Sequence, residues 1–182
     1  MKNEIKNPKL NKTVLVVTYV LASIACLNAK ALNVFGSDDR VPVRLSYPYS
    51  AIGRVESNGG HCTGTLIGPD LVLTAAHCIG RKGDPVEFYP KMIDGESLTK
   101  ANGVRTWRGT YDPQLDREKD WAVVQLDKNL GSIYGYIPVL NDPDATYVTQ
   151  VGYSYDRYDG EGWRQRGAKV LGQDKSNKTP SP

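Results

Sequence analysis

The sequence predicts an all-β fold made of short antiparallel strands. From Leu32 onward, short apolar segments rich in β-branched and aromatic residues alternate with Gly, Pro, Asn and Asp. No stretch shows a convincing helical period, and no segment repeats at a fixed interval. Many short strands separated by such turn residues are typical of a β-sandwich or a β-barrel.

The composition is that of an ordinary globular protein. The chain has 182 residues, of which 40% are hydrophobic and 24% charged, and this excludes a disordered or fibrous chain. The formal net charge is +3, but four lysines lie before residue 13: Lys2, Lys6, Lys9 and Lys12. The remainder is close to neutral, so the charge gives no reason to expect nucleic acid as a partner.

The first 31 residues are predicted to be a signal peptide. After the lysines comes an apolar run of 14 residues, Val14 to Leu27, and then Ala29-Lys30-Ala31, a pattern that signal peptidases cleave. The run is shorter than the about 20 apolar residues that span a membrane. An uncleaved anchor and a lipoprotein signal at Cys26 are the alternatives. We expect a secreted or periplasmic protein that has no membrane association after cleavage.

The strand candidates follow in order. A hairpin is expected from Cys62 to Ile67 and Leu71 to Thr74, joined by the turn Gly68-Pro69-Asp70. The segment 131–143, rich in Gly, Pro and Asn, is expected to connect two lobes. Residues 175–182 are polar and are expected to form an unstructured tail. The other strand candidates are 52–56, 86–93, 104–111, 121–126, 146–153 and 165–171.

The cysteine count indicates one disulfide. If cleavage removes Cys26, Cys62 and Cys78 remain, and in an oxidising compartment such a pair is most simply a disulfide. Zinc is the alternative, because His61-Cys62 and His77-Cys78 offer two nitrogens and two sulfurs. Structural zinc ligands usually stand two to five residues apart, whereas here each histidine adjoins its cysteine. We therefore expect neither a metal nor a cofactor.

Two motifs carry the expected chemistry. An apolar strand, Leu71 to Leu73, leads into Thr74-Ala75-Ala76-His77-Cys78, and an acid, Asp120, directly precedes the apolar strand Trp121 to Leu126. A general base must be held rigidly close to the hydroxyl that it deprotonates, and the small alanines let the backbone pack closely behind His77. Nearby Asp112, Asp116 and Asp127 precede no apolar strand and are expected to be solvated.

These motifs resemble those of the trypsin and chymotrypsin family of serine peptidases. The first matches the family's Thr-Ala-Ala-His-Cys motif and the second its Asp-(Ile/Trp)-Ala-Leu-Leu segment. The family's histidine and aspartate are about 45 residues apart in that order, and here the separation is 43. The resemblance implies that His77 and Asp120 are catalytic, that the aspartate is buried against the ring, and that the Cys62–Cys78 disulfide pins the loop that carries the histidine.

The resemblance also implies the domain organisation. The family builds two antiparallel barrels, with the histidine and aspartate in the first and the serine in the second. Residues 41–140 are then the first barrel and 141–174 the start of the second, in a chymotrypsin-like all-β fold. Phe35 to Arg40 and Tyr47-Pro48-Tyr49 are similar to the processing region of bacterial glutamyl-endopeptidase-like members. A pro-segment over 32–40 is therefore expected.

The nucleophile is expected to be missing. The family's serine lies in a Gly-Asp-Ser-Gly-like turn about 93 residues after the aspartate, near position 213, and no Gly-x-Ser-Gly follows Asp120. Ser132, Ser154 and Ser176 are interpreted as loop or strand serines. We therefore expect a C-terminally truncated, frameshifted or split peptidase for protein or peptide substrates, inactive alone, whose partner could be a separate chain with the second barrel. The alternative is an inactive homologue that acts as a secreted binding protein.

Overall fold

A computed structural model describes residues 38–44, 46–93, 95–140, 146–156 and 160–169. The predicted signal peptide, most of the predicted pro-segment and the predicted tail lie outside these residues. Within the described part of the chain, no helix is long and apolar enough to cross a membrane.

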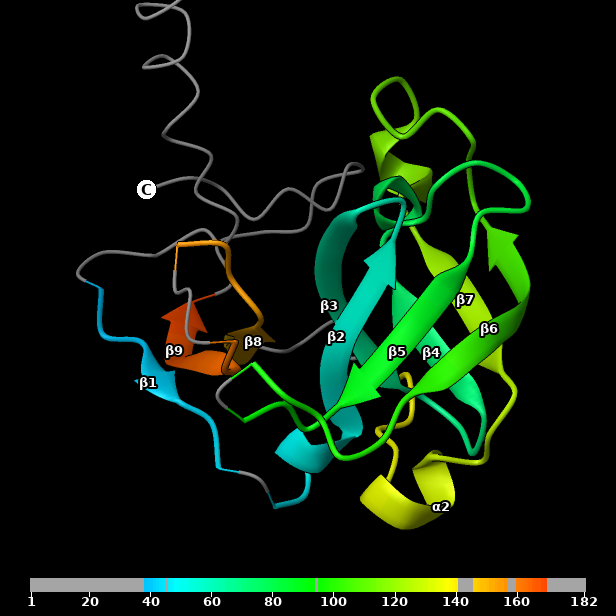
Figure 1. Cartoon of the computed structure of the whole chain (residues 1–182). Coiled ribbons are helices and arrows are strands. Elements are labelled where there is room, and N and C mark those ends of the chain that lie inside the picture. The colour runs from blue at the N-terminus through cyan, green and yellow to red at the C-terminus, as the bar shows by residue number, and fades with distance from the viewer. Residues whose placement is uncertain (1–37, 45, 94, 141–145, 157–159, 170–182) are drawn as a thin grey trace, which may run out of the picture. The chain divides into compact units, whose positions relative to one another are not determined.

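Six antiparallel strands form a closed barrel (Figure 1). The order around the barrel is β2-β3-β4-β7-β6-β5, and β5 pairs back onto β2. This architecture confirms the expected all-β fold and the predicted hairpin, which is β3 followed by β4. The strands are β2 (Ile52–Ser57), β3 (Gly60–Leu66), β4 (Leu71–Thr74), β5 (Val86–Pro90), β6 (Ala101–Arg108) and β7 (Ala122–Leu126).

The barrel interior is packed around Phe88, which is 1% exposed. Residues of β2, β5 and β7 alternate between buried and half-buried positions, as strands with one face in a core do. Gly53 leaves the space that the ring needs, since a Cβ there would lie 2.7 Å from Phe88, and Gly64 leaves space for Val55, because a Cβ at Gly64 would lie 2.5 Å from it. The remaining core residues include Leu66, Val72, Val124, Leu126 and Leu130.

A second sheet has three strands in the order β1-β9-β8: β1 (Val41–Pro42), β9 (Trp163–Lys169) and β8 (Tyr147–Gly152). Residues 41–42, predicted to open the first barrel, pair with β9 instead. The backbone N–H of Val43 extends this pairing by donating to the carbonyl of Gly162. The preceding Arg40 anchors the segment, because its buried guanidinium pairs with Asp156 at 2.6 Å. The residue pattern that predicts strands gives no indication of this ion pair.

The connection after the barrel contains a short helix, α2 (Gly131–Tyr134), where no helix was expected. Four residues are too few to show a helical period in the sequence. The backbone N–H of Gly131 bonds to the carbonyl of Pro69, and that of Ile137 bonds to Leu66. Figure 1 shows α2 at one end of the barrel, which the buried Leu130 helps to close.

Several strand boundaries differ from the prediction, and two of these differences have identifiable reasons. β6 begins at Ala101, three residues early, because Asn102 is a strand residue whose amide donates to Asp127, not a turn residue. β5 ends at Pro90, since Lys91 adopts a positive φ of 51° that breaks the strand.

Candidate active site

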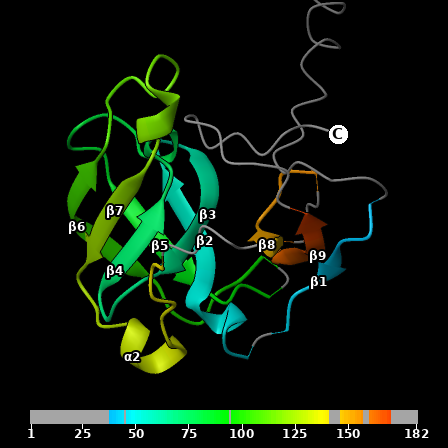
Figure 2. The same ribbon diagram turned by 180° about the vertical axis from the view of Figure 1, so that it is seen from behind.

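The pairing of β4 with β7 brings the two predicted site residues together. The strands are antiparallel, and Thr74 at the end of β4 lies opposite Ala122 at the start of β7. His77 follows the first strand within one turn, η2 (Ala76–Cys78), and Asp120 lies two residues before the second, after the turn η3 (Arg117–Lys119). Figure 2 shows β4 and β7 side by side from behind. The register of β4 against β7 therefore places His77 and Asp120 at the same end of the barrel.

His77 and Asp120 are joined by two hydrogen bonds. The backbone N–H of His77 donates to Oδ1 of Asp120 at 2.9 Å, and Nδ1 of the ring lies 2.7 Å from Oδ2. Both carboxylate oxygens of Asp120 are thus bonded to His77, which fixes the orientation of the imidazole ring. A carboxylate in this position accepts the Nδ1 hydrogen, so Nε2 carries the unprotonated lone pair of the neutral ring.

The pair is more accessible than the sequence implied. The side chain of His77 is 59% exposed and that of Asp120 is 24% exposed, so the carboxylate is half-buried where a buried one was expected. It lies in an open pocket whose wall comes from the loop between β6 and β7. The lining residues are His77, Pro113, Gln114, Arg117, Glu118, Asp120 and Trp121.

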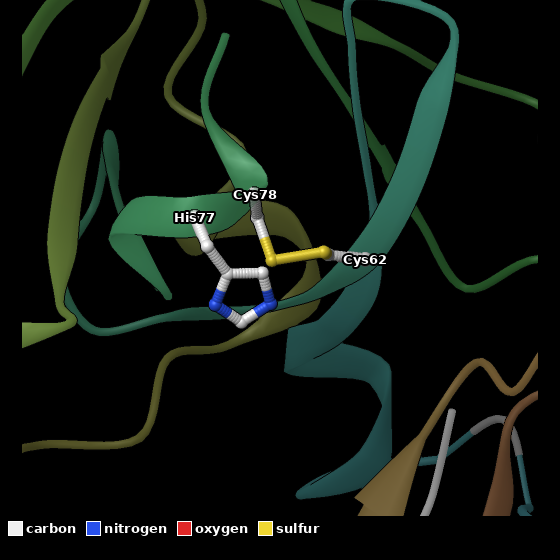
Figure 3. A group of neighbouring side chains, drawn as sticks. All are labelled: Cys62, His77 and Cys78. Atoms are coloured by element: carbon white, nitrogen blue, oxygen red, sulfur yellow. A yellow bond between two sulfur atoms is a disulfide. The ribbon is translucent and has the colours of Figure 1, made fainter. Parts of the chain in front are cut away.

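A disulfide between Cys62 and Cys78 holds the histidine turn against β3 (Figure 3). Figure 3 shows the ring of His77 beside this bond, with Cys78 on the same turn and Cys62 on the strand. The hydroxyl of Thr74 adds a second link between β4 and β3 by donating to the carbonyl of Thr63 at 2.9 Å. The turn that carries the imidazole is thus tied covalently to the barrel.

The geometry disfavours the zinc alternative. Ligand atoms of Cys62, His77 and Cys78 lie within 4.8 Å of one another. Both sulfurs, however, are bonded to each other, so neither is the thiolate that zinc requires. His61, the fourth proposed ligand, stacks on Tyr155 with ring centroids 3.7 Å apart.

Neither described serine candidate faces the imidazole. The hydroxyl of Ser132 donates to Asn129, and Ser154 is buried beside the guanidinium of Arg40. Ser176 lies outside the described residues. The two pockets that include His77 are lined by no serine in the part of the chain that the structure describes. Ser132, interpreted as a loop or strand serine, lies in the short helix α2, and Ser154 lies two residues after the end of β8.

The three competing aspartates are exposed and bonded elsewhere. Asp127 accepts from the backbone and side chain of Asn102, which lowers the pKa of its carboxyl group. Asp112 accepts from the backbone of Leu115, and Asp116 forms an ion pair with Lys119. Among the described residues, none of the three forms a hydrogen bond or ion pair with His77, whose partner is Asp120.

Arg40 is a structural residue that the sequence reasoning missed, since Phe35 to Arg40 suggested only a processing region. Its guanidinium, 2% exposed, bonds to Asp38 and Asp156, and these hydrogen bonds raise its pKa. Nearby, the backbone N–H of Tyr153 donates to Thr63 of β3. Buried arginines are costly unless paired, so an Arg preceded by acids is the only sequence signal that could have indicated this anchor.

A closed antiparallel barrel that presents a hydrogen-bonded histidine and aspartate from neighbouring strand ends defines the class of chymotrypsin-like proteins. The chain belongs to the trypsin family, whose model matches residues 38–179.

Individual proteins that resemble the chain are more specific than the family alone. The chain is 31% identical over 162 residues to the glutamyl endopeptidase of Bacillus licheniformis, covering 78% of this chain and 48% of that protein. It is 29% identical over 110 residues to human granzyme M, covering 59% of this chain and 41% of that protein. A solved structure of a Glu endopeptidase superposes with a TM-score of 0.68 at 27% identity, covering 82% of this chain and 78% of the other. The chain spans about half the length of the curated relatives it matches.

Proposed function

We propose that this chain provides the general base and the orienting acid of a serine endopeptidase. The observation that carries the proposal is the contact of 2.7 Å between Nδ1 of His77 and Oδ2 of Asp120. In this role, Nε2 takes a proton from a serine hydroxyl as that hydroxyl attacks the substrate carbonyl, and later returns it to the leaving amine. Asp120 keeps the ring in the required tautomer and stabilises the imidazolium that forms.

The hydroxyl comes from a segment other than residues 1–182. Ser132 and Ser154 are engaged away from His77, and the sequence has no Gly-x-Ser-Gly after Asp120. Without a nucleophile no acyl-enzyme forms, so these residues are inactive alone. A C-terminal continuation or a separate chain with the second barrel would complete the enzyme.

The proposed substrates are proteins or peptides, and the proposed site of action is outside the cytoplasm. Export is supported by the apolar run Val14 to Leu27 followed by Ala29-Lys30-Ala31. The disulfide supports the same assignment, because such bonds persist in oxidising compartments.

A chimaera tests the proposal. The chain is produced alone and also extended with the C-terminal segment of the B. licheniformis relative, and both are assayed on casein and with a fluorophosphonate that labels activated serines. The chain alone should give neither hydrolysis nor labelling, whereas the chimaera should give both. In the chimaera, His77→Ala should abolish hydrolysis, while Asp116→Asn, at an exposed acid outside the pockets beside His77, should leave it unchanged.

Two results would contradict the proposal. Hydrolysis by the unextended chain that the fluorophosphonate inhibits would show a nucleophile within these residues. An extended chain that folds but remains inactive would favour the alternative, a catalytically inactive homologue that acts as a secreted binding protein.

A further inference from the structure

A cationic groove adjoins His77 on the side of the loop that follows it. Two pockets, of about 650 and 390 Å³, share Ile79, Tyr111 and three basic residues. The first pocket includes His77, and the second continues along β6 to Arg105. We define the cationic groove by its four basic residues, Arg81, Lys82, Arg105 and Arg108.

Arg108 is held in place at the centre of this groove. Its guanidinium donates to the carbonyl of Gly80 at 3.0 Å and lies 5.0 Å from the ring centroid of Tyr111. Among the described residues, these contacts use one of five N–H donors, which leaves the others for a ligand. Because Gly80 lies three residues after His77, the guanidinium is fixed relative to the imidazole before any ligand binds.

The groove has an excess of positive charge that the protein does not neutralise. Within the described residues, none of its four cations forms an ion pair. In contrast, Arg40, Arg54 and Lys100 each bond to a carboxylate.

Two acidic residues also line the groove, and they do not cancel its positive charge. Asp84 accepts from the backbone N–H of Arg81, and Asp112 from that of Leu115. Four cations against two acids leave an excess of two positive charges beside the candidate catalytic base.

We propose that the cationic groove binds acidic side chains of the polypeptide substrate, on the flank of the scissile bond that lies over residues 79–85. The inference rests on the proposed peptidase function and deepens it, since it names a class of substrate. A fixed guanidinium binds a carboxylate through two parallel hydrogen bonds, which favours Asp and Glu over neutral residues. Arg81, Lys82 and Arg105 extend the attraction along the chain.

Binding is measured without catalysis. A fluorescein-labelled peptide of repeated Gly-Asp-Ser is titrated with the full chain by fluorescence anisotropy, alongside peptides with Asn or Lys in place of Asp. The acidic peptide should bind most tightly, and binding should weaken as ionic strength rises. The triple variant Arg81→Gln, Lys82→Gln, Arg108→Gln should bind the acidic peptide about tenfold more weakly, because it loses three charge pairs with the peptide.

A matched control removes the same charge elsewhere. Arg44, Lys128 and Arg166 are exposed and line neither pocket. Their triple substitution by Gln should leave binding of the acidic peptide within about twofold of the wild-type value, because screened charges outside the groove contribute little. Equal losses in the two triple variants would show a net-charge effect and overturn the proposal.

Histidine NMR locates the bound peptide. The sequence has only two histidines, so their ring signals report separately on His77 beside the groove and on His61 stacked against Tyr155. The acidic peptide should shift the His77 ring signals and leave those of His61 unchanged. Shifts confined to His61, or none at all, would overturn the assignment.

A heparin oligosaccharide tests whether the groove binds a sulfated polysaccharide, the other polyanion that such a groove could bind, in place of an acidic peptide. Tighter binding of a heparin oligosaccharide than of the acidic peptide, lost in the same groove variant, would assign the surface to a sulfated polysaccharide and overturn the proposal. All these readouts are independent of hydrolysis. An inactive chimaera that still binds acidic peptides would therefore contradict the proposed function alone, and an active chimaera without this preference would contradict the groove alone.

Discussion

Thr74 and Ala122 lie opposite each other in the antiparallel pairing of β4 and β7, and the position of the candidate site follows from that register. The turn with His77 continues from one strand, and the loop with Asp120 enters the other. A shift of one residue in either strand would exchange buried and exposed side chains along it, so the core residues Val72 and Val124 also fix the site.

Loss of the disulfide should lower the free energy of unfolding by about 3 kcal/mol, because it closes a loop of about 15 residues. The change is Cys62→Ser together with Cys78→Ser, and the measurement is guanidinium chloride unfolding. A reducing agent should destabilise the wild-type protein by a similar amount and have no effect on the double variant. Equal stability of the oxidised and reduced wild-type protein would contradict the covalent link.

Phe88→Ala should lower the free energy of unfolding by about 3–5 kcal/mol, because the fully buried ring fills the barrel interior. Leu98→Ala is the control, since Leu98 is 100% exposed and should change stability by less than about 0.5 kcal/mol. Urea unfolding of both variants measures the difference. Similar costs at the two positions would contradict the packing around residue 88.

Acidification should destabilise the protein partly through His61. Burial, followed by the nearby Arg54 charge, lowers the pKa of His61. The folded pKa is therefore below the unfolded value of about 6.5, so the unfolded state binds protons more readily. Stability should fall as pH drops below about 6.5 and through the folded pKa, and His61→Gln should flatten this dependence. If the urea midpoint changed with pH equally in the wild-type protein and in the His61→Gln variant, this contribution of His61 would be contradicted.

The fold class was accessible from the sequence for physical reasons, and the His77–Asp120 pair through the resemblance to the trypsin family. Apolar segments between turn residues mark short strands, and Thr74 to Cys78 and Asp120 to Leu126 carry local motifs at a characteristic separation. The catalytic roles themselves remain predictions. The disulfide was indicated by the cysteine count together with the export signal.

Features that depend on distant contacts were not accessible. The burial of Arg40 depends on Asp156, which is 116 positions away, and Val41 joins the second sheet only because β9 offers an edge. Similarly, the loop between β6 and β7 places Pro113 and Gln114 in one pocket with Asp120 without any motif. The groove position of Arg108 depends on a bond to Gly80, on another element of the chain.

The ring tautomer of His77 is the most direct test of the proposed base. The contact between Nδ1 and Oδ2 of Asp120 predicts that the neutral ring carries its hydrogen on Nδ1, which ¹⁵N NMR of histidine-labelled protein reads at a pH where the ring is neutral. Asp120→Asn should abolish this preference, whereas Asp112→Asn should preserve it. A wild-type His77 that carries its hydrogen on Nε2, or that is unaffected by Asp120→Asn, would contradict the assignment of this pair as base and orienting acid.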